Sequence, residues 1–112
     1  MLLLTETLIH DSIMLLCVVT GGFMENLNEI SGLIAKMSEA DICKFLEEIL
    51  TPSEVSTLTK RWRIMKLLSQ GVSQRVIARD LNVSLCKVTR GAKILKDENS
   101  VSRNLIKGVN ND

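Results

Sequence analysis

Aromatic residues and proline are scarce in this 112-residue chain, which has two phenylalanines, one tryptophan, no tyrosine and a single proline. With 46% hydrophobic residues and so little proline, the composition favours helices that share an apolar core. The length is that of one small domain. A small helical domain this rich in leucine, isoleucine and valine gains stability by burying surface against a second copy. We therefore predict an all-α fold that assembles as an oligomer.

Residues that bind metals or act in catalysis are also few. Cys17, Cys43 and Cys86 are widely spaced with no CxxC pair, and His10 is the single histidine. This pattern argues against a structural zinc site, and an odd number of isolated thiols is typical of a reducing cytoplasm. The chain has no glycine-rich phosphate loop and no base patterned near a nucleophile. We predict a cytoplasmic protein that is not an enzyme and has no resident cofactor.

Residues 1–23 are apolar but do not have the pattern of a membrane segment. Glu6, His10 and Asp11 interrupt the apolar run, and no lysine or arginine precedes it. Three interpretations are open, namely an amphipathic arm, a weak membrane anchor, or residues translated from an upstream start. We favour the third, with Met24 as the true start, because the composition becomes ordinary and amphipathic there. The predicted domain then spans residues 24–112 and has no contact with a membrane.

Charge is divided unevenly along the chain, although the net charge is only +1. Residues 1–50 carry two lysines against eight acidic residues, whereas residues 51–112 carry twelve basic residues against five acidic ones. The carboxy-terminal half is therefore the part suited to a polyanionic partner.

Apolar residues spaced by three and four predict an amphipathic helix from Asn26 to about Met37 and a second helix that begins at Ser38. The segment 51–54, TPSE, predicts a capping box at the start of a long helix, with the proline in its first position. This helix should run to Gly71, which supplies a left-handed stop. We expect Trp62, near its middle, to pack in the core.

Residues 73–96 predict two short helices joined by a tight turn. Ser73 and Ser84 are suited to cap the two helices, and Asn82 tolerates the left-handed bend between them. This arrangement is the helix-turn-helix pattern, and six basic residues against Asp80 give the charge that DNA binding needs. Helical bundles that never bind nucleic acid share the pattern, so that alternative stays open. A last short helix follows at residues 101–106, with the end of the chain, from Gly108, frayed.

The segments LTPSEVSTLTKRWRI (50–64), SQR (73–75) and VTRGAKILK (88–96) together resemble the tryptophan operon repressor family. The resemblance covers about half of the chain, with one gap in the loop around Gly71. It implies a multi-helix intertwined homodimer whose helix-turn-helix heads bind a palindromic operator in double-stranded DNA. It also implies that L-tryptophan binds as corepressor between the long helix and the recognition helix.

The resemblance also implies a ligand site. Arg61 and Arg90 would lie on the two faces of the indole, because guanidinium groups stack on aromatic rings and bind carboxylates. Thr51 would help to hold the ligand near the dimer partner, and the backbone carbonyl of Leu50 would accept a hydrogen bond from the ligand's ammonium group. Gly91 would leave space beside the ring. The implied DNA contacts are Arg75, Leu85, Cys86, Lys87, Thr89 and, at a phosphate, Lys96.

Three positions depart from the family pattern. Ile94 replaces a serine that lines the ligand pocket, and Lys87 replaces a small hydroxyl residue near both ligand and phosphate. Ala78 replaces a lysine that faces DNA. We expect a repressor of an aromatic amino-acid operon that is gated by L-tryptophan, with an operator of its own. Another aromatic effector, an effector-independent DNA-binding regulator and a helical dimerisation module without DNA binding are the alternatives.

Overall fold

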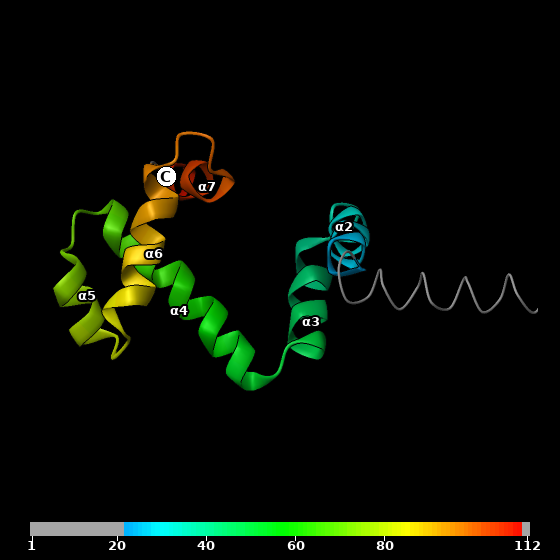
Figure 1. The fold of residues 1–112 in the computed structure, drawn as a ribbon. Coiled ribbons are helices and arrows are strands. Elements are labelled where there is room, and N and C mark those ends of the chain that lie inside the picture. Colours follow the sequence, from blue (N-terminus) through cyan, green and yellow to red (C-terminus); the bar gives the residue numbers. More distant parts are fainter. Residues whose placement is uncertain (1–21, 111–112) are drawn as a thin grey trace, which may run out of the picture. The chain divides into compact units, whose positions relative to one another are not determined.

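The computed structural model describes residues 22–110, which form six helices and no strand (Figure 1). This part of the chain divides into two compact units, one ending at Phe45 and the other beginning at Leu46. The predicted all-α class is confirmed for these residues. The interpretation of residues 1–23 as translated from an upstream start falls almost wholly outside them.

Helices α2 (Gly22–Ile34) and α3 (Glu39–Ile49) make up most of the described acidic half. Helix α2 begins earlier than predicted, at Gly22. It also ends earlier, because the backbone N–H groups of Lys36 and Met37 donate to carbonyls three residues back and form a tight turn. Ser38 caps α3 as predicted, since its Oγ accepts a hydrogen bond from the Asp41 backbone N–H at 3.3 Å.

Helix α4 (Pro52–Ser69) begins with the predicted capping box. The Glu54 backbone N–H donates to Thr51 Oγ1 at 3.2 Å, and the Thr51 backbone N–H donates to Glu54 Oε1 at 3.0 Å. Hydrogen bonds from Thr51, above all from its backbone N–H, hold the pKa of Glu54 below the ordinary value of 4.5. The helix ends two residues before Gly71, which has the expected left-handed backbone with φ +88°.

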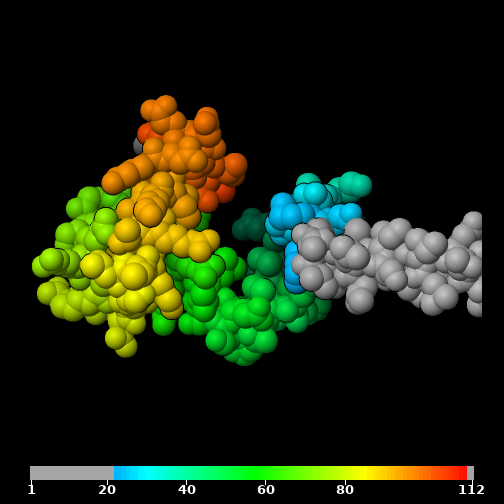
Figure 2. All heavy atoms as spheres, in the orientation of Figure 1, coloured from blue at the N-terminus to red at the C-terminus, as the bar shows by residue number. Residues whose placement is uncertain are grey.

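Helices α5 (Gln74–Asp80) and α6 (Leu85–Lys96) follow with the predicted caps and turn. The Ser73 hydroxyl accepts from the Val76 backbone N–H, and the Ser84 hydroxyl accepts from the Lys87 backbone N–H. Asn82 is the one non-glycine residue with a positive φ, 52°, in the described residues. Figure 2 shows the atoms of α6 lying against those of α5.

The core of the second unit joins α4, α5 and α6 through Ile64, Ile77 and Val88, all essentially inaccessible to solvent. Around these three side chains pack the partly buried residues Leu67, Leu68, Val72, Ala78, Leu81 and Val83. This packing holds α6 against α4 in the structure, so side chains of the two helices meet along their contact.

Helix α7 (Val101–Asn110) packs on α4 and α6 through the buried Ile106. The expected fraying from Gly108 is wrong for the described residues, since the helix continues to Asn110. The side-chain amide of Asn110 donates to Ser69 Oγ at 2.6 Å, which ties the last turn of α7 to the end of α4.

The core position expected for Trp62 is wrong in this chain, because its side chain is 37% exposed. Trp62 lies two residues before the buried Ile64, and two residues on an α-helix turn the side chain to nearly the opposite face. Leu58, one turn earlier on the same face, is also exposed. In residues 22–110, no helix has the length and apolar character that crossing a membrane requires.

Candidate functional site

A cavity of about 120 Å³ lies between the middle of α4 and residues 87–94 of α6. Helix α4 contributes side chains at spacings of three and four, and α6 does the same, so one stripe of each helix faces the cavity. We call this space the α4–α6 cavity, and its lining residues are Arg61, Ile64, Met65, Lys87, Arg90, Gly91 and Ile94.

Gly91 allows α6 to lie close to α4. A Cβ atom at this position would lie 3.3 Å from Ile64 Cγ2 and 3.4 Å from Leu68 Cδ1, closer than methyl groups normally approach. The floor of the cavity is consequently apolar and tightly packed, while its rim carries the charged side chains.

The rim of the α4–α6 cavity is strongly cationic. Arg61, Lys87 and Arg90 are exposed at their helix surfaces, and none of them forms an ion pair or a side-chain hydrogen bond within residues 22–110. The lining includes no acidic side chain. An apolar floor under unpaired cations suits a ligand with a flat apolar body and a carboxylate.

Four of the residues predicted to bind the ligand therefore line one cavity, namely Arg61, Arg90, Gly91 and Ile94. The other two do not. Leu50 and Thr51 precede α4, and Thr51 is ten residues before Arg61, or about 15 Å along the helix axis. The Thr51 hydroxyl is already engaged in the capping box.

Sequence reasoning missed two lining residues, Ile64 and Met65. The sequence spacing could have identified them, because they follow Arg61 by three and four residues and so lie on the same face of the helix. Lys87, assigned to the DNA contacts, also lines the α4–α6 cavity.

The residues predicted to contact DNA lie on α5 and α6. Arg75, Cys86, Lys87 and Lys96 are exposed, and Leu85 is 46% exposed. Together with Lys93 these exposed cations make the surface of α5 and α6 basic. Lys93 borders a shallow hollow of about 320 Å³ together with Cys86, Thr89 and Arg90.

Thr89 differs from the other predicted DNA contacts because it is partly buried. Its hydroxyl lies 3.0 Å from the side-chain oxygen of Gln74 and 3.0 Å from the Leu85 carbonyl oxygen. The first distance connects the start of α5 to the middle of α6. Thr89 therefore holds the two helices in register.

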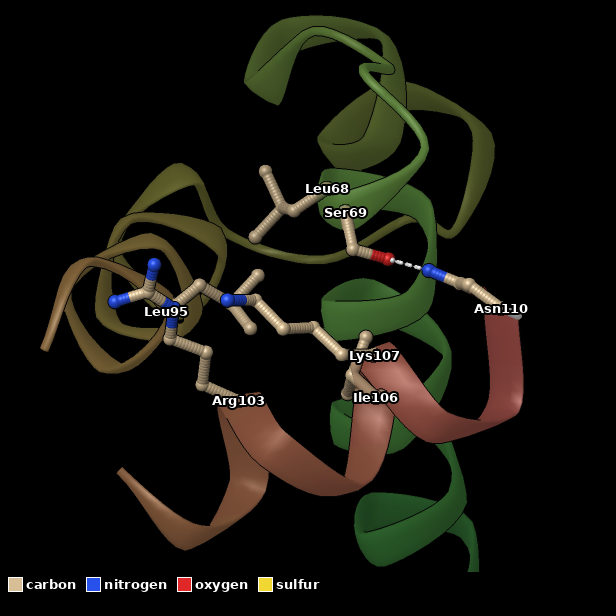
Figure 3. Close-up of a pocket in the computed structure, with 7 residues that line it drawn as sticks. All are labelled: Leu68, Ser69, Leu95, Arg103, Ile106, Lys107 and Asn110. Carbon is tan, nitrogen blue, oxygen red and sulfur yellow. Dashed lines mark hydrogen bonds between the residues drawn. The ribbon is translucent and has the colours of Figure 1, made fainter. Parts of the chain in front are cut away.

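A larger hollow of about 400 Å³ lies where α7 crosses the ends of α4 and α6 (Figure 3). Arg103 and Lys107 extend over an apolar floor that includes Leu95, and the hydrogen bond between Asn110 and Ser69 closes one end. None of the predicted site residues lines it. The exposed apolar side chains Val101, Leu105 and Val109 stand on the neighbouring face of α7, so this hollow belongs to a surface rich in unburied apolar groups.

These features define a small all-helical protein with a basic two-helix surface beside a cationic cavity. A family model described as Trp repressor protein matches residues 25–109. The chain is 48% identical over 63 residues to the Trp operon repressor homologs of Xylella fastidiosa strains M23 and 9a5c, covering 55% of this chain and 68% of each relative. No solved structure matches the chain. The chain belongs to the Trp repressor protein family, a family of transcriptional regulators.

Proposed function

We propose that this chain is a transcriptional repressor of an aromatic amino-acid operon. In this proposal α5 and α6 form a helix-turn-helix that binds double-stranded DNA. L-Tryptophan bound in the α4–α6 cavity raises the affinity of the protein for DNA. The observation that carries the proposal is the convergence of Arg61, Arg90, Gly91 and Ile94 on one cavity between α4 and α6.

The charge and exposure of α5 and α6 support DNA binding. Arg75, Lys87, Lys93 and Lys96 are exposed and make no ion pair within residues 22–110, so binding a phosphate does not require an internal partner to be broken. Side chains at the start of α6 would reach base edges in the major groove, while the lysines release counterions from phosphates.

The small size of the α4–α6 cavity supports a coupling between ligand binding and DNA binding. Pockets for drug-sized ligands are about 300–1,000 Å³, whereas this one measures about 120 Å³. A bound indole would therefore separate α6 from α4 and change the angle of the DNA-binding helix. A ligand that binds one angle better than another shifts the population toward it, and a useful switch needs about 1–3 kcal/mol of such coupling.

Exposed apolar side chains support a homodimer. Phe23 is 74% exposed on α2, Val101 is 72% exposed on α7, and α4 exposes Leu58 and Trp62. An intertwined dimer buries such side chains and pairs the acidic helices of one copy with basic helices of the other. In this arrangement Leu50 and Thr51 of a second copy complete the ligand site, because they lie too far from Arg61 along their own α4.

A gel-shift titration of the full chain tests the proposal, using DNA upstream of its own gene and of adjacent aromatic amino-acid genes. Millimolar L-tryptophan should tighten specific binding by at least fivefold, which is about 1 kcal/mol of coupling. Arg90→Ala should lose most of this response and weaken DNA binding.

Equal DNA binding with and without tryptophan would refute the role of tryptophan as corepressor and leave an effector-independent DNA-binding regulator. The apolar Ile94 favours this second function, because its side chain offers no polar contact to a ligand. No specific shift on any fragment would refute DNA recognition and leave the dimerisation module.

A further inference from the structure

The hollow of about 400 Å³ where α7 crosses the ends of α4 and α6 has no part in the proposed function. We call it the α7 hollow, and it shares no lining residue with the α4–α6 cavity. Sites for small organic ligands usually measure about 300–1,000 Å³ and combine a mainly apolar lining with a few convergent polar groups. The α7 hollow has this size, so a small organic molecule can enter it without separating the helices around it.

Three helices supply the apolar floor of the α7 hollow. Leu68 comes from α4, Leu95 from α6 and Ile106 from α7 (Figure 3). Ile106 is fully buried and the other two side chains are partly buried, so the packing of the second unit holds the floor in place. All three side chains are aliphatic, and the floor offers no aromatic ring on which a ligand could stack. The floor therefore suits the aliphatic part of a ligand.

The rim of the α7 hollow is positively charged. Arg103 and Lys107 are one turn apart on α7, and Figure 3 shows both side chains extending over the floor. No acidic side chain lines the hollow, and neither cation forms an ion pair or a side-chain hydrogen bond within residues 22–110. Ser69 and Asn110 close the other end through their own hydrogen bond of 2.6 Å. An anion in the hollow is therefore attracted by two cations, whereas an ammonium group is repelled by both.

The exposed apolar side chains of α7 do not line this hollow. Val101 and Leu105 precede Arg103 and Lys107 by two residues each, and two residues on an α-helix turn the side chain to another face. A second copy of the chain that buries Val101, Leu105 and Val109 therefore need not cover the α7 hollow.

We propose that the α7 hollow is a second ligand site, which binds a small aliphatic carboxylate. The carboxylate lies between Arg103 and Lys107, and the aliphatic body lies on the floor. The site is independent of the proposed DNA binding and of the proposed tryptophan site, because it uses the residues of neither. Its ligand touches α4, α6 and α7 together, and it stabilises the folded chain because it binds only where these three helices meet.

Isothermal titration calorimetry of the full chain, without DNA, tests the inference with three probes that share the same linear alkyl chain length. The probes are octanoate, which is anionic, 1-octanol, which is neutral, and octylamine, which is cationic at neutral pH. Octanoate should bind saturably at millimolar concentrations, and the other two probes should bind more weakly by about fivefold or more. Arg103→Gln and Lys107→Gln should each weaken octanoate by about threefold, the size expected of one exposed ion pair.

Lys36→Gln is the matched control, because it removes the charge of one exposed lysine that does not line the α7 hollow. It should leave the affinity for octanoate unchanged. Arg90→Ala locates the binding, because Arg90 lines the α4–α6 cavity and not the α7 hollow, and octanoate should bind this variant as it binds the wild type. Circular dichroism spectra that match the wild type confirm that each variant is folded.

Three results would overturn the inference. They are the absence of saturable octanoate binding, octylamine that binds as tightly as octanoate, and octanoate affinity that is lost in Arg90→Ala but kept in Arg103→Gln and Lys107→Gln. If octanoate does not bind and the Arg103→Gln/Lys107→Gln double variant sediments as a monomer, acidic side chains of a second copy occupy the hollow instead. The gel shift with L-tryptophan measures a different site, so the proposed function stands or falls separately.

Discussion

Replacing Gly91 with alanine separates the packing of α6 on α4 from the binding of a ligand between them. An alanine inside a helix is favoured over glycine by about 1 kcal/mol. At Gly91 this gain is opposed, because the new methyl group would lie 3.3 Å from Ile64 Cγ2 and 3.4 Å from Leu68 Cδ1. Leu68 Cδ1 is the end of a flexible side chain, whereas Ile64 Cγ2 is the branch methyl of a stiff, buried one. Crowding of this kind costs about 1–3 kcal/mol.

The two terms partly cancel, and Gly91→Ala should lower the free energy of unfolding by no more than about 2 kcal/mol. The effect on ligand binding should be far larger. The methyl group would occupy the narrow apolar floor of a cavity of only about 120 Å³, where the ring of the ligand must lie. Gly91→Ala should therefore fold, bind DNA and fail to respond to L-tryptophan.

Gly32→Ala on α2 is the matched control, since a Cβ at that helical glycine has no heavy atom within 4 Å. It should gain the full helix preference of about 1 kcal/mol and keep the ligand response. Urea denaturation at one fixed protein concentration gives the stabilities, and gel shifts with and without tryptophan give the response. The reasoning is refuted if Gly91→Ala is stabilised as much as Gly32→Ala and still responds to tryptophan.

Three further predictions concern the core, the start of α4 and the DNA surface. Ile77→Ala should lower the free energy of unfolding by about 2–5 kcal/mol in urea titrations, because the side chain is fully buried between α4 and α6; a cost below 1 kcal/mol would contradict this core. Because the pKa of Glu54 is lowered in the folded chain, its contribution to stability is complete above pH 4.5 and is lost as the pH falls through the lowered value. Glu54→Gln should remove this part of the acid dependence seen by circular dichroism, and an unchanged acid transition would count against it. Lys96→Ala should weaken binding to all DNA sequences alike and reduce the salt dependence by about one unit of slope, so a loss confined to one sequence would contradict a phosphate contact.

Local signals in the sequence were enough to place most helix ends. Thr51, Ser73 and Ser84 were identified as caps because their hydroxyls accept hydrogen bonds from nearby backbone N–H groups, a relation that spans only three residues. Asn82 was placed in its left-handed turn for a similarly local reason. The start of α2 and the last turn of α7 were missed. In that last turn, Asn110 donates a hydrogen bond to Ser69, forty-one positions earlier in the chain. A short sequence pattern cannot predict a contact over such a separation.

The candidate site was only partly accessible from the sequence. The resemblance brought Arg61 and Arg90 together, and the structure places both at the α4–α6 cavity. The resemblance put Lys87 near both ligand and phosphate, and we assigned it to the DNA contacts, since spacing along one helix says nothing about which neighbouring helix a side chain faces. The prediction of a core position for Trp62 was wrong, because a large apolar residue in an apolar helical stripe usually packs in the core. In the single chain only one face of α4 is buried, and Trp62 lies on the other face.

The hydrogen bond between Thr89 and Gln74, together with the packing of Ile77 on Val88, makes α5 and α6 a single mechanical body. The chain joins this body to the end of α4 through the short segment 70–73, where Gly71 provides the bend, and the buried Ile64 and helix α7 also hold the body against α4. A displacement of α6 relative to α4 therefore carries α5 with it, and it must also change the packing of Ile64 against both helices.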